Sequence, residues 1–314
     1  MKKTLILLLL TPIFLLNAGT ASSQDMDSTG LPGDHFSLQG ALEMFKKAGS
    51  PEEFEKLINT QSNNVNNLDL NGDGEIDYVR VIDKSEKDAH AFVLQVAVSA
   101  TENQDIAVIE LEKTGNENAV LQIVGDEEIY GQQTIVEPSD GTNDDEVSPA
   151  KHGPNVSYNE PDLVVNVWMW PAVRFVYRPA YVVWVSPWYW RTYPVWWHRW
   201  RPFPWYVFHP RAIVYRPFCR VVYTQRVLVA HRLYTPYRST SVFVHTRYVG
   251  PANNYHVNRT MQRVNVTGPR GNEFHRIRTT TAVRERDGDR FKGRDRGREE
   301  KFKEKREKGR GRRG

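Results

Sequence analysis

Residues 69–83, which read Asp-Leu-Asn-Gly-Asp-Gly-Glu-Ile-Asp-Tyr-Val-Arg-Val-Ile-Asp, separate a helical segment from a segment of strands. Between Ile76 and Asp83 two sets of side chains alternate with a period of two, which is the spacing of a β-strand. The residues just before this strand are rich in Asp, Asn and Gly, which favour turns and loops. The stretch therefore predicts a polar loop that leads directly into a strand.

The segment before this loop, residues 36–60, predicts two short helices. Its apolar residues recur at spacings of three and four, beginning with Phe36, Leu38, Leu42 and Phe45. Ser50 followed by Pro51 is typical of a helix N-cap and first helical position, so the second helix is expected to begin there. The break between the two helices is expected at Gly49.

Further alternating segments follow at about 91–99, 105–113 and 119–124, separated by short runs of turn-forming residues. Helices followed by consecutive short strands predict an α+β fold, with N-terminal helices packed on one face of a four-stranded antiparallel sheet. This acidic domain is expected to span residues 24–136.

The first 23 residues predict a secretory signal peptide. Lys2 and Lys3 precede an apolar run from Leu5 to Leu16, which is too short to span a bilayer. Cleavage is expected after Ser23, or alternatively after Ala21, and an uncleaved anchor is the other interpretation. We therefore expect an exported protein of the periplasm, cell envelope or extracellular space, without a transmembrane span in the mature chain.

Charge is distributed very unevenly along the chain. Residues 24–160 contain 8 Lys and Arg against 28 Asp and Glu, a net charge of −20, whereas residues 161–314 contain 32 against 10, a net charge of +22. Two interpretations stay open at this point. The halves attract each other within or between molecules, or the basic half binds an external polyanion.

Composition divides the rest of the chain into three parts. Residues 137–162 predict a linker, and residues 163–283 predict a basic, aromatic region of short strands interrupted by prolines. Residues 284–314 predict a disordered basic tail. All nine tryptophans lie between Trp168 and Trp205. They form either a compact core between the short strands or an exposed binding face.

Catalytic residues are not predicted. One cysteine, Cys219, excludes an intrachain disulfide, and the nine histidines show no paired spacing typical of a zinc site. The sequence also lacks the nucleophile-elbow, phosphate-loop and dinucleotide-binding motifs, so no cofactor-binding residues other than metal ligands are expected.

The Asp-rich loop is the one motif that points to a ligand. Calcium prefers six or seven oxygen ligands, and a loop can supply them from its first, third, fifth, seventh and ninth positions. These positions are occupied by Asp69, Asn71, Asp73, Glu75 (through its backbone carbonyl) and Asp77. Calcium is therefore the predicted cofactor. The alternative is a turn stabilised by Asx hydrogen bonds without any metal.

This loop resembles the calcium loops of EF-hand and dockerin proteins over nine to twelve residues. Gly74 at the sixth position fits the sharp turn that such loops make. The chain departs from the pattern at the twelfth position, where Arg80 replaces the expected acid. A seventh ligand would then come from elsewhere, with Asp83 as a candidate, or the site would bind weakly with additional water.

The order of the segments resembles exported proteins of Bacteroidota that have no assigned function. The resemblance is carried by the signal peptide, the helical segment, the Asp-rich loop, the phrase Val-Gly-Asp-Glu-Glu-Ile-Tyr-Gly at residues 124–131 and the Trp-rich block. It implies an envelope or secreted setting and supplies no catalytic residue.

We therefore expect a non-enzymatic binding or structural protein with a calcium-stabilised domain. Its expected partners are an anionic envelope polymer or lipid head groups, and no physiological nucleic acid. The alternative is a hydrolase acting on envelope glycan or protein through paired carboxylates. The sequence leaves the oligomeric state open.

Overall fold

The computed structural model describes residues 28–139 and 164–267, with side chains up to Thr260. The predicted signal peptide, nearly all of the predicted linker and the predicted basic tail lie outside the described residues. The chain divides into two compact units, Met1–Ala252 and Asn253–Gly314. The first unit contains the sheet and every residue of the site described below.

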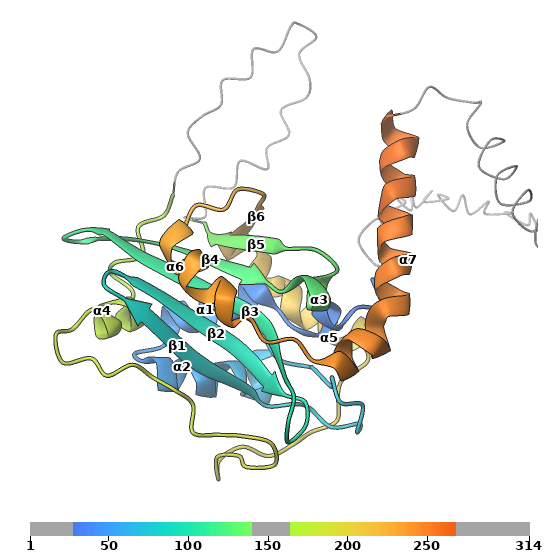
Figure 1. The fold of residues 1–314 in the computed structure, drawn as a ribbon, viewed down its shortest axis with the longest axis horizontal. Coiled ribbons are helices and arrows are strands. Elements are labelled where there is room, and N and C mark those ends of the chain that lie inside the picture. Colours follow the sequence, from blue (N-terminus) through green and yellow to red (C-terminus); the bar gives the residue numbers. More distant parts are fainter. Residues whose placement is uncertain (1–27, 140–163, 268–314) are drawn as a thin grey trace, which may run out of the picture. The chain divides into compact units, whose positions relative to one another are not determined.

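Six strands form one antiparallel sheet with the order β1-β2-β3-β4-β5-β6 (Figure 1). Their bounds are β1 Val79–Glu86, β2 Ala89–Ala97, β3 Asn103–Gly115, β4 Asn118–Gly125, β5 Thr134–Pro138 and β6 Cys219–Val222. The predicted α+β class and the antiparallel sheet are confirmed. The predicted number of four strands is wrong, because β5 pairs with β4 and β6 pairs with β5, as in Ile135 opposite Val222.

The helices before the sheet begin where the sequence predicts them. Ser37 caps α1 and Ser50 caps α2, each accepting a hydrogen bond from a backbone N–H of the first turn. The helices are α1 Leu38–Lys47, α2 Pro51–Ile58, α3 Glu127–Tyr130, α4 Pro171–Val176, α5 Trp205–Ala212, α6 Leu228–Tyr234 and α7 Val242–Thr267. Short 3₁₀ helices are η1 Pro32–His35, η2 Gln61–Asn63, η3 Ile213–Phe218 and η4 Thr235–Tyr237.

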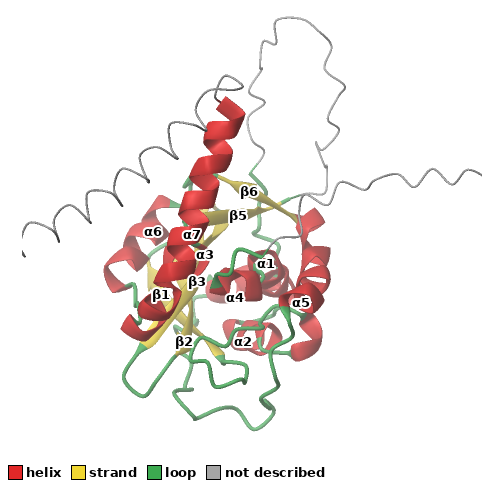
Figure 2. Cartoon of the chain, turned by 90° about the vertical axis from the view of Figure 1, so that its right-hand side faces the viewer, coloured by secondary structure: helices red, strands yellow, loops and turns green. Residues whose placement is uncertain are grey.

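Different parts of the chain cover the two faces of the sheet, with α1, α2 and α4 on one side and α6 on the other (Figure 2). Along β2, Phe92 and Leu94 enter the larger core beneath α1 and α2, whereas Ala91 and Val93 contact the smaller cluster that Tyr234 of α6 completes. Helices therefore lie on both faces, and not on the single face predicted.

The region predicted to consist of short strands is largely helical. Within residues 164–267 the structure has one strand of the sheet, β6, beside four α-helices. Proline at the first position of α4 favours a helix start, and Val173 and Val176 then share its buried face. Ser241 caps the start of α7 by accepting from the N–H of Val244. Alternation over three or four residues did not reveal these helix starts.

The first residues after the predicted linker join the core of the acidic half. Val167 and Trp170 are buried in the same cluster as α1 and α2. The N–H of Val167 donates to the carbonyl of Ala119 in β4 at 3.0 Å. Both halves of the chain thus contribute to one hydrophobic core within the first unit. Among the described helices, none is long and apolar enough to cross a membrane.

Candidate functional site

The Asp-rich loop is folded around the carboxylate of Asp69. This carboxylate accepts hydrogen bonds from the backbone N–H groups of Gly72 at 2.7 Å, Asp73 at 3.1 Å and Gly74 at 3.0 Å. Gly72 and Gly74 have φ values of 75° and 82°, which residues with a side chain rarely adopt. The two glycines therefore allow the backbone to turn its amides towards Asp69.

The other predicted ligands point into the same loop. Asn71 and Asp73 each accept from a backbone N–H two residues further on, at 2.8 and 2.9 Å. Asp77 accepts from the N–H of Leu70 at 2.6 Å and from the side-chain amide of Asn71 at 2.9 Å. The structure thus brings the four side chains together, and the hydrogen bonds are those of the Asx-turn alternative.

One carboxyl group of the loop, that of Asp77, is buried near other acidic side chains. The Asp77 side chain is buried, and this burial raises its pKa from 3.8 to about 7. The nearby charges of Asp69 and Asp73 contribute to this rise in pKa. A cation close to these carboxylates would oppose it, since a cation favours their charged forms.

Two arginines from the second half of the chain lie against the loop. Arg199 donates to the carboxylate of Glu75 at 2.6 Å and lies 3.4 Å from that of Asp73. Arg247 packs so closely on Gly72 that a Cβ atom there would fall 1.8 Å from the guanidinium. Within residues 28–139 and 164–260, no group of three or more His, Cys, Asp or Glu side chains is arranged to hold a metal ion.

The predicted seventh ligand lies elsewhere. The carboxylate of Asp83 is buried in contact with the His90 imidazole at 3.0 Å and accepts from the Tyr181 hydroxyl at 2.7 Å. Arg80, at the twelfth position, donates to Gln95 of β2. Both side chains are engaged by partners outside the loop, so neither Asp83 nor Arg80 completes a calcium site.

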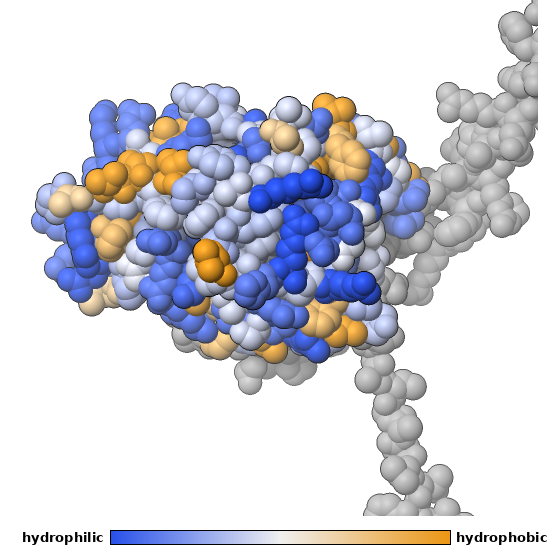
Figure 3. Space-filling view, turned by 90° about the horizontal axis from the view of Figure 1, so that it is seen from below, coloured by the Kyte–Doolittle hydropathy of each residue, from blue (hydrophilic) through white to orange (hydrophobic). Residues whose placement is uncertain are grey.

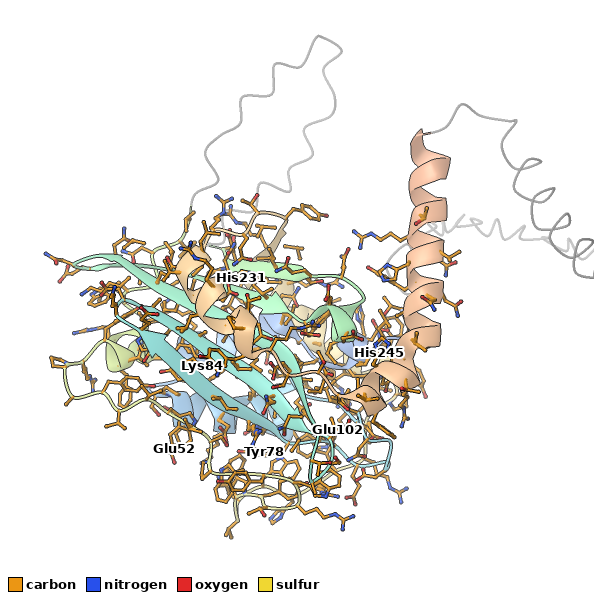
Figure 4. The ribbon with its side chains drawn as sticks, viewed as in Figure 1. Glu52, Tyr78, Lys84, Glu102, His231 and His245 are labelled. Atoms are coloured by element: carbon orange, nitrogen blue, oxygen red, sulfur yellow. The ribbon has the colours of Figure 1, made fainter. Side chains whose placement is uncertain are left out.

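Residues 178–206, which we call the aromatic segment, pack directly on the end of the loop. The N–H of Ile76 donates to the carbonyl of Trp200 at 2.9 Å. Ile76, Tyr78 and Trp197 form a small buried cluster, in which the Tyr78 and Trp197 rings meet edge to face with centroids 5.0 Å apart. Figure 4 shows Tyr78 close to the many ring side chains of this part of the molecule.

The aromatic segment also covers the outer edge of β1. Val185 forms an isolated antiparallel bridge with Ile82. On either side of it, the N–H of Asp83 donates to Trp184 at 2.8 Å and the N–H of Ser186 donates to Val81 at 3.0 Å. These bonds satisfy backbone groups that an edge strand would otherwise leave open to pairing with another chain.

A buried carboxylate joins the aromatic segment to α2 and β1. Glu55 of α2 is 2% exposed and accepts four hydrogen bonds, one from a backbone N–H and three from side chains. The donors are Val81 N–H at 2.8 Å, Tyr78 O–H at 2.8 Å, Ser186 O–H at 2.9 Å and Trp184 Nε1–H at 3.3 Å. Burial raises the pKa of Glu55, and these donors oppose that rise.

The tryptophans pack mainly as a core. Trp170 and Trp197 are buried, six others are partly buried, and Trp196 alone of the nine is exposed. The interpretation of a compact aromatic core therefore holds for most of the rings. The outer side of the aromatic segment instead exposes aliphatic side chains, with Val195 94% and Val182 83% exposed.

Basic side chains of the second half contact acidic side chains of the sheet and of the loop before α3. Figure 4 shows His231 on α6, in front of the strands. The pairs are Glu110 with His231 at 2.7 Å, Asp126 with Arg238 at 2.5 Å and Glu137 with Arg220 at 3.1 Å. The two arginine pairs thus show attraction between the oppositely charged halves within one molecule.

A cavity of about 210 Å³ lies beside the loop and is lined in part by His35, Asn67, Asp69 and Tyr248. The His35 ring contacts the Asn67 amide at 2.9 Å, and burial lowers the pKa of the imidazole. The cavity adds polar groups next to the loop that the sequence analysis did not identify.

Comparison with known proteins does not assign this arrangement. No protein-family model matches the chain, and no curated protein or solved structure is significantly similar to it. Sequence reasoning also missed Glu55 and Arg199. Glu55 is one acid among many in the first half, and Arg199 contacts acids more than a hundred residues away in the sequence.

Replacing Glu55 by alanine should destabilise the protein strongly. The change leaves four donors without their acceptor in a buried position, and each unsatisfied donor costs about 1–3 kcal/mol. We expect the free energy of unfolding in urea to fall by about 3 kcal/mol or more. The matched control is Glu52→Ala on the exposed side of the same helix, which should change stability by less than about 0.5 kcal/mol. Similar losses for the two variants would contradict the role given to Glu55.

Stability should fall as pH rises, because buried acids keep protons in the folded state. Burial raises the pKa of Asp77 and Glu110 to about 7 and that of Asp105 to about 6. Their stabilising contribution is full below about pH 4, where the unfolded chain is also protonated, and is lost as pH rises through 6 and 7. With chelator present, we expect the unfolding free energy to decrease by at least about 2 kcal/mol between pH 5 and pH 8.

A Glu110→Gln variant tests the origin of this slope. Glutamine has the shape of the protonated acid and does not titrate, so the variant should show a shallower dependence on pH than the original chain. Glu86→Gln, at an exposed position of β1, should leave the slope unchanged. Stability that increases from pH 5 to pH 8 in the original chain would refute the prediction.

Proposed function

We propose that the protein is a non-enzymatic binding protein of the cell envelope or the extracellular space, and that the aromatic segment carries its partner-binding surface. One observation carries this proposal: the segment is fixed on its inner side and exposes arginine and apolar side chains on its outer side. Glu55, the edge of β1 and the Asp-rich loop hold the inner side. The exported setting rests on the signal peptide predicted for residues 1–23.

The partner should be anionic. Residues 163–272 contain no Asp or Glu, and residues 164–267 contain fourteen arginines and no lysine. Several of these arginines pair with acids of the sheet, but Arg178, Arg191 and Arg201 are exposed on the aromatic segment. Arginine pairs well with phosphate and carboxylate groups because its guanidinium offers two parallel donors. An anionic envelope polymer or lipid head groups meet this requirement.

We further propose that the Asp-rich loop binds calcium and thereby stabilises the first unit. The turns at Gly72 and Gly74 and the carboxylates of Asp69, Asp73 and Asp77 support this proposal. The Asp73 carboxylate would exchange Arg199 for the ion, and the carbonyl of Glu75 would add a ligand. When bound, calcium supplies charge neutralisation and a crosslink between oxygens of one loop.

Calcium should raise thermal stability, because an ion that binds only the folded state stabilises it in proportion to the logarithm of its concentration above Kd. We expect a higher melting temperature with millimolar calcium than with chelator, and a measurable heat of binding. Asp73→Ala should remove the increase and leave the apo fold intact, since Asp73 is exposed. Glu86→Ala serves as the control and should keep the full increase. Equal melting temperatures with calcium and chelator, without heat of binding, would exclude the site.

Association with anionic surfaces or polymers should depend on the exposed arginines. Each arginine near an anionic surface contributes about 1 kcal/mol, so Arg191→Gln with Arg201→Gln should weaken binding roughly thirtyfold. Affinity should also fall steeply between low and physiological salt. The measurement is titration of the full chain with anionic vesicles and with an acidic polysaccharide.

Two comparisons locate the contact. Arg174→Gln with Arg232→Gln removes the same charge from exposed positions outside the aromatic segment and should change affinity less. A chain that ends at residue 283 tests the contribution of the predicted basic tail. If the truncated chain loses all binding, the tail and not the aromatic segment is the contact, and absence of binding to every anionic probe would refute the proposed function.

A further inference from the structure

We infer that the outer side of the aromatic segment inserts into an anionic lipid bilayer, with exposed valines entering the interfacial region while arginines contact the lipid phosphates. This inference rests on the proposed function and narrows its partner from anionic components in general to a membrane surface. Three properties of the described segment lead to it: exposed apolar side chains, tryptophan rings that are mostly covered, and its charge.

Several apolar side chains of the aromatic segment are strongly exposed to solvent. Val195 is 94% exposed, Val182 83%, Tyr189 61% and Val185 59%. Figure 3 shows hydrophobic side chains separated by strongly hydrophilic ones on the face seen from below, where the chain loops beyond the end of the sheet (Figures 1 and 3). Aliphatic side chains beside basic ones are the pattern by which peripheral proteins enter a membrane interface.

A carbohydrate or other stiff polymer would need a different surface. Binding of sugars uses exposed ring faces, but eight of the nine tryptophans are at least partly buried against other rings or strands. One small pocket on this segment, between Tyr78, Arg80 and Trp188, has a volume of about 10 Å³, enough for a single water molecule. The larger cavity beside the Asp-rich loop meets the segment at Pro202. The valine side chains of the segment, in contrast, protrude into solvent.

The charges around these valine side chains suit anionic lipids. Arg178, Arg191 and Arg201 are exposed on the same segment, which itself contains no acid. The neighbouring helix α2 contributes the exposed acids Glu52 and Glu53 and also Lys56, whose ammonium lies 5.6 Å from the centre of the Trp196 ring. An anionic membrane would repel Glu52 and Glu53. The protein would therefore approach the membrane with the outer side of the aromatic segment.

The aromatic segment is already fixed on the protein, so its insertion would cost little conformational entropy. Glu55, the bridge between Ile82 and Val185 and the pairing of Arg199 with Glu75 fix its inner side before any lipid is met. A preorganised surface binds more tightly than one that must become ordered on contact.

Vesicle binding of the full chain tests this inference. The probes are vesicles of phosphatidylcholine alone and of phosphatidylcholine mixed with phosphatidylglycerol, and an acidic polysaccharide. Val182→Ser with Val195→Ser should lower partitioning into the mixed vesicles roughly tenfold, because two partly inserted valines are lost. The matched control is Val229→Ser with Val242→Ser, at positions 45% and 72% exposed outside the segment, which should partition as the original chain does.

Tryptophan fluorescence gives an independent readout of depth. All nine tryptophans lie between residues 168 and 205, so lipids brominated near the head group should quench the fluorescence of the bound protein. Trp196→Phe should remove most of that quenching, since Trp196 is the exposed ring. A merely electrostatic attachment, for example through the predicted tail, would leave fluorescence unquenched.

The outcomes separate this inference from the proposed function. Equal partitioning of the valine variant and the original chain, or binding of polysaccharide without binding of vesicles, overturns membrane insertion and leaves the proposed function standing. Absence of binding to all three probes overturns both. Loss of vesicle binding in the valine variant alone, together with quenching that depends on Trp196, supports the inference.

Discussion

The buried carboxylate of Glu55 is the point on which the arrangement of the first unit depends. A carboxylate removed from water is strongly unfavourable unless hydrogen bonds replace its hydration. Here the donors come from β1, from Tyr78 at its start and from residues 184–186 of the aromatic segment. A segment broken by prolines cannot hold itself in one conformation through its own helices or strands. The aromatic segment is held because its donors form hydrogen bonds with Glu55, which is fixed on α2.

The same principle applies on the other face of the sheet. Acids of β3, β5 and the loop before α3 are buried beneath residues 220–241, and arginine and histidine side chains reach them from above. Each such pair has a large cost of desolvation that the attraction must offset. The two halves of the chain have net charges of −20 and +22. Part of this opposite charge is therefore neutralised by pairs within the molecule. What remains for a partner is the set of arginines that the sheet does not engage.

Local patterns in the sequence predicted the helices and strands whose formation depends on neighbouring residues. The spacing of Phe36 to Phe45, the cap at Ser50 and the alternation after Ile76 gave α1, α2 and β1 to β4, because each of these signals acts within a few residues. β6 and its pairing with β5 depend on contacts between distant residues, which no local pattern contains. Residues 163–283 were predicted to form short strands, but Pro171 and the cap at Ser241 favour helices there. The loop side chains converge as predicted, whereas Arg199 and Arg247 come from the far half of the chain.

The contacts of Arg199 link the Asp-rich loop to the surface of the aromatic segment. The guanidinium bridges Glu75 and Asp73, and the neighbouring residues Trp197 and Trp200 pack on Ile76 at the end of the loop. A cation bound among the loop carboxylates would compete with Arg199 for Asp73 and would thereby change the support of the aromatic segment. Coupling between two binding events is reciprocal, so a membrane or polymer that favours one position of the segment would change the affinity of the loop for the cation by the same factor. Because the loop and the proposed binding surface share Arg199, we expect a ligand at one of them to change the affinity of the other.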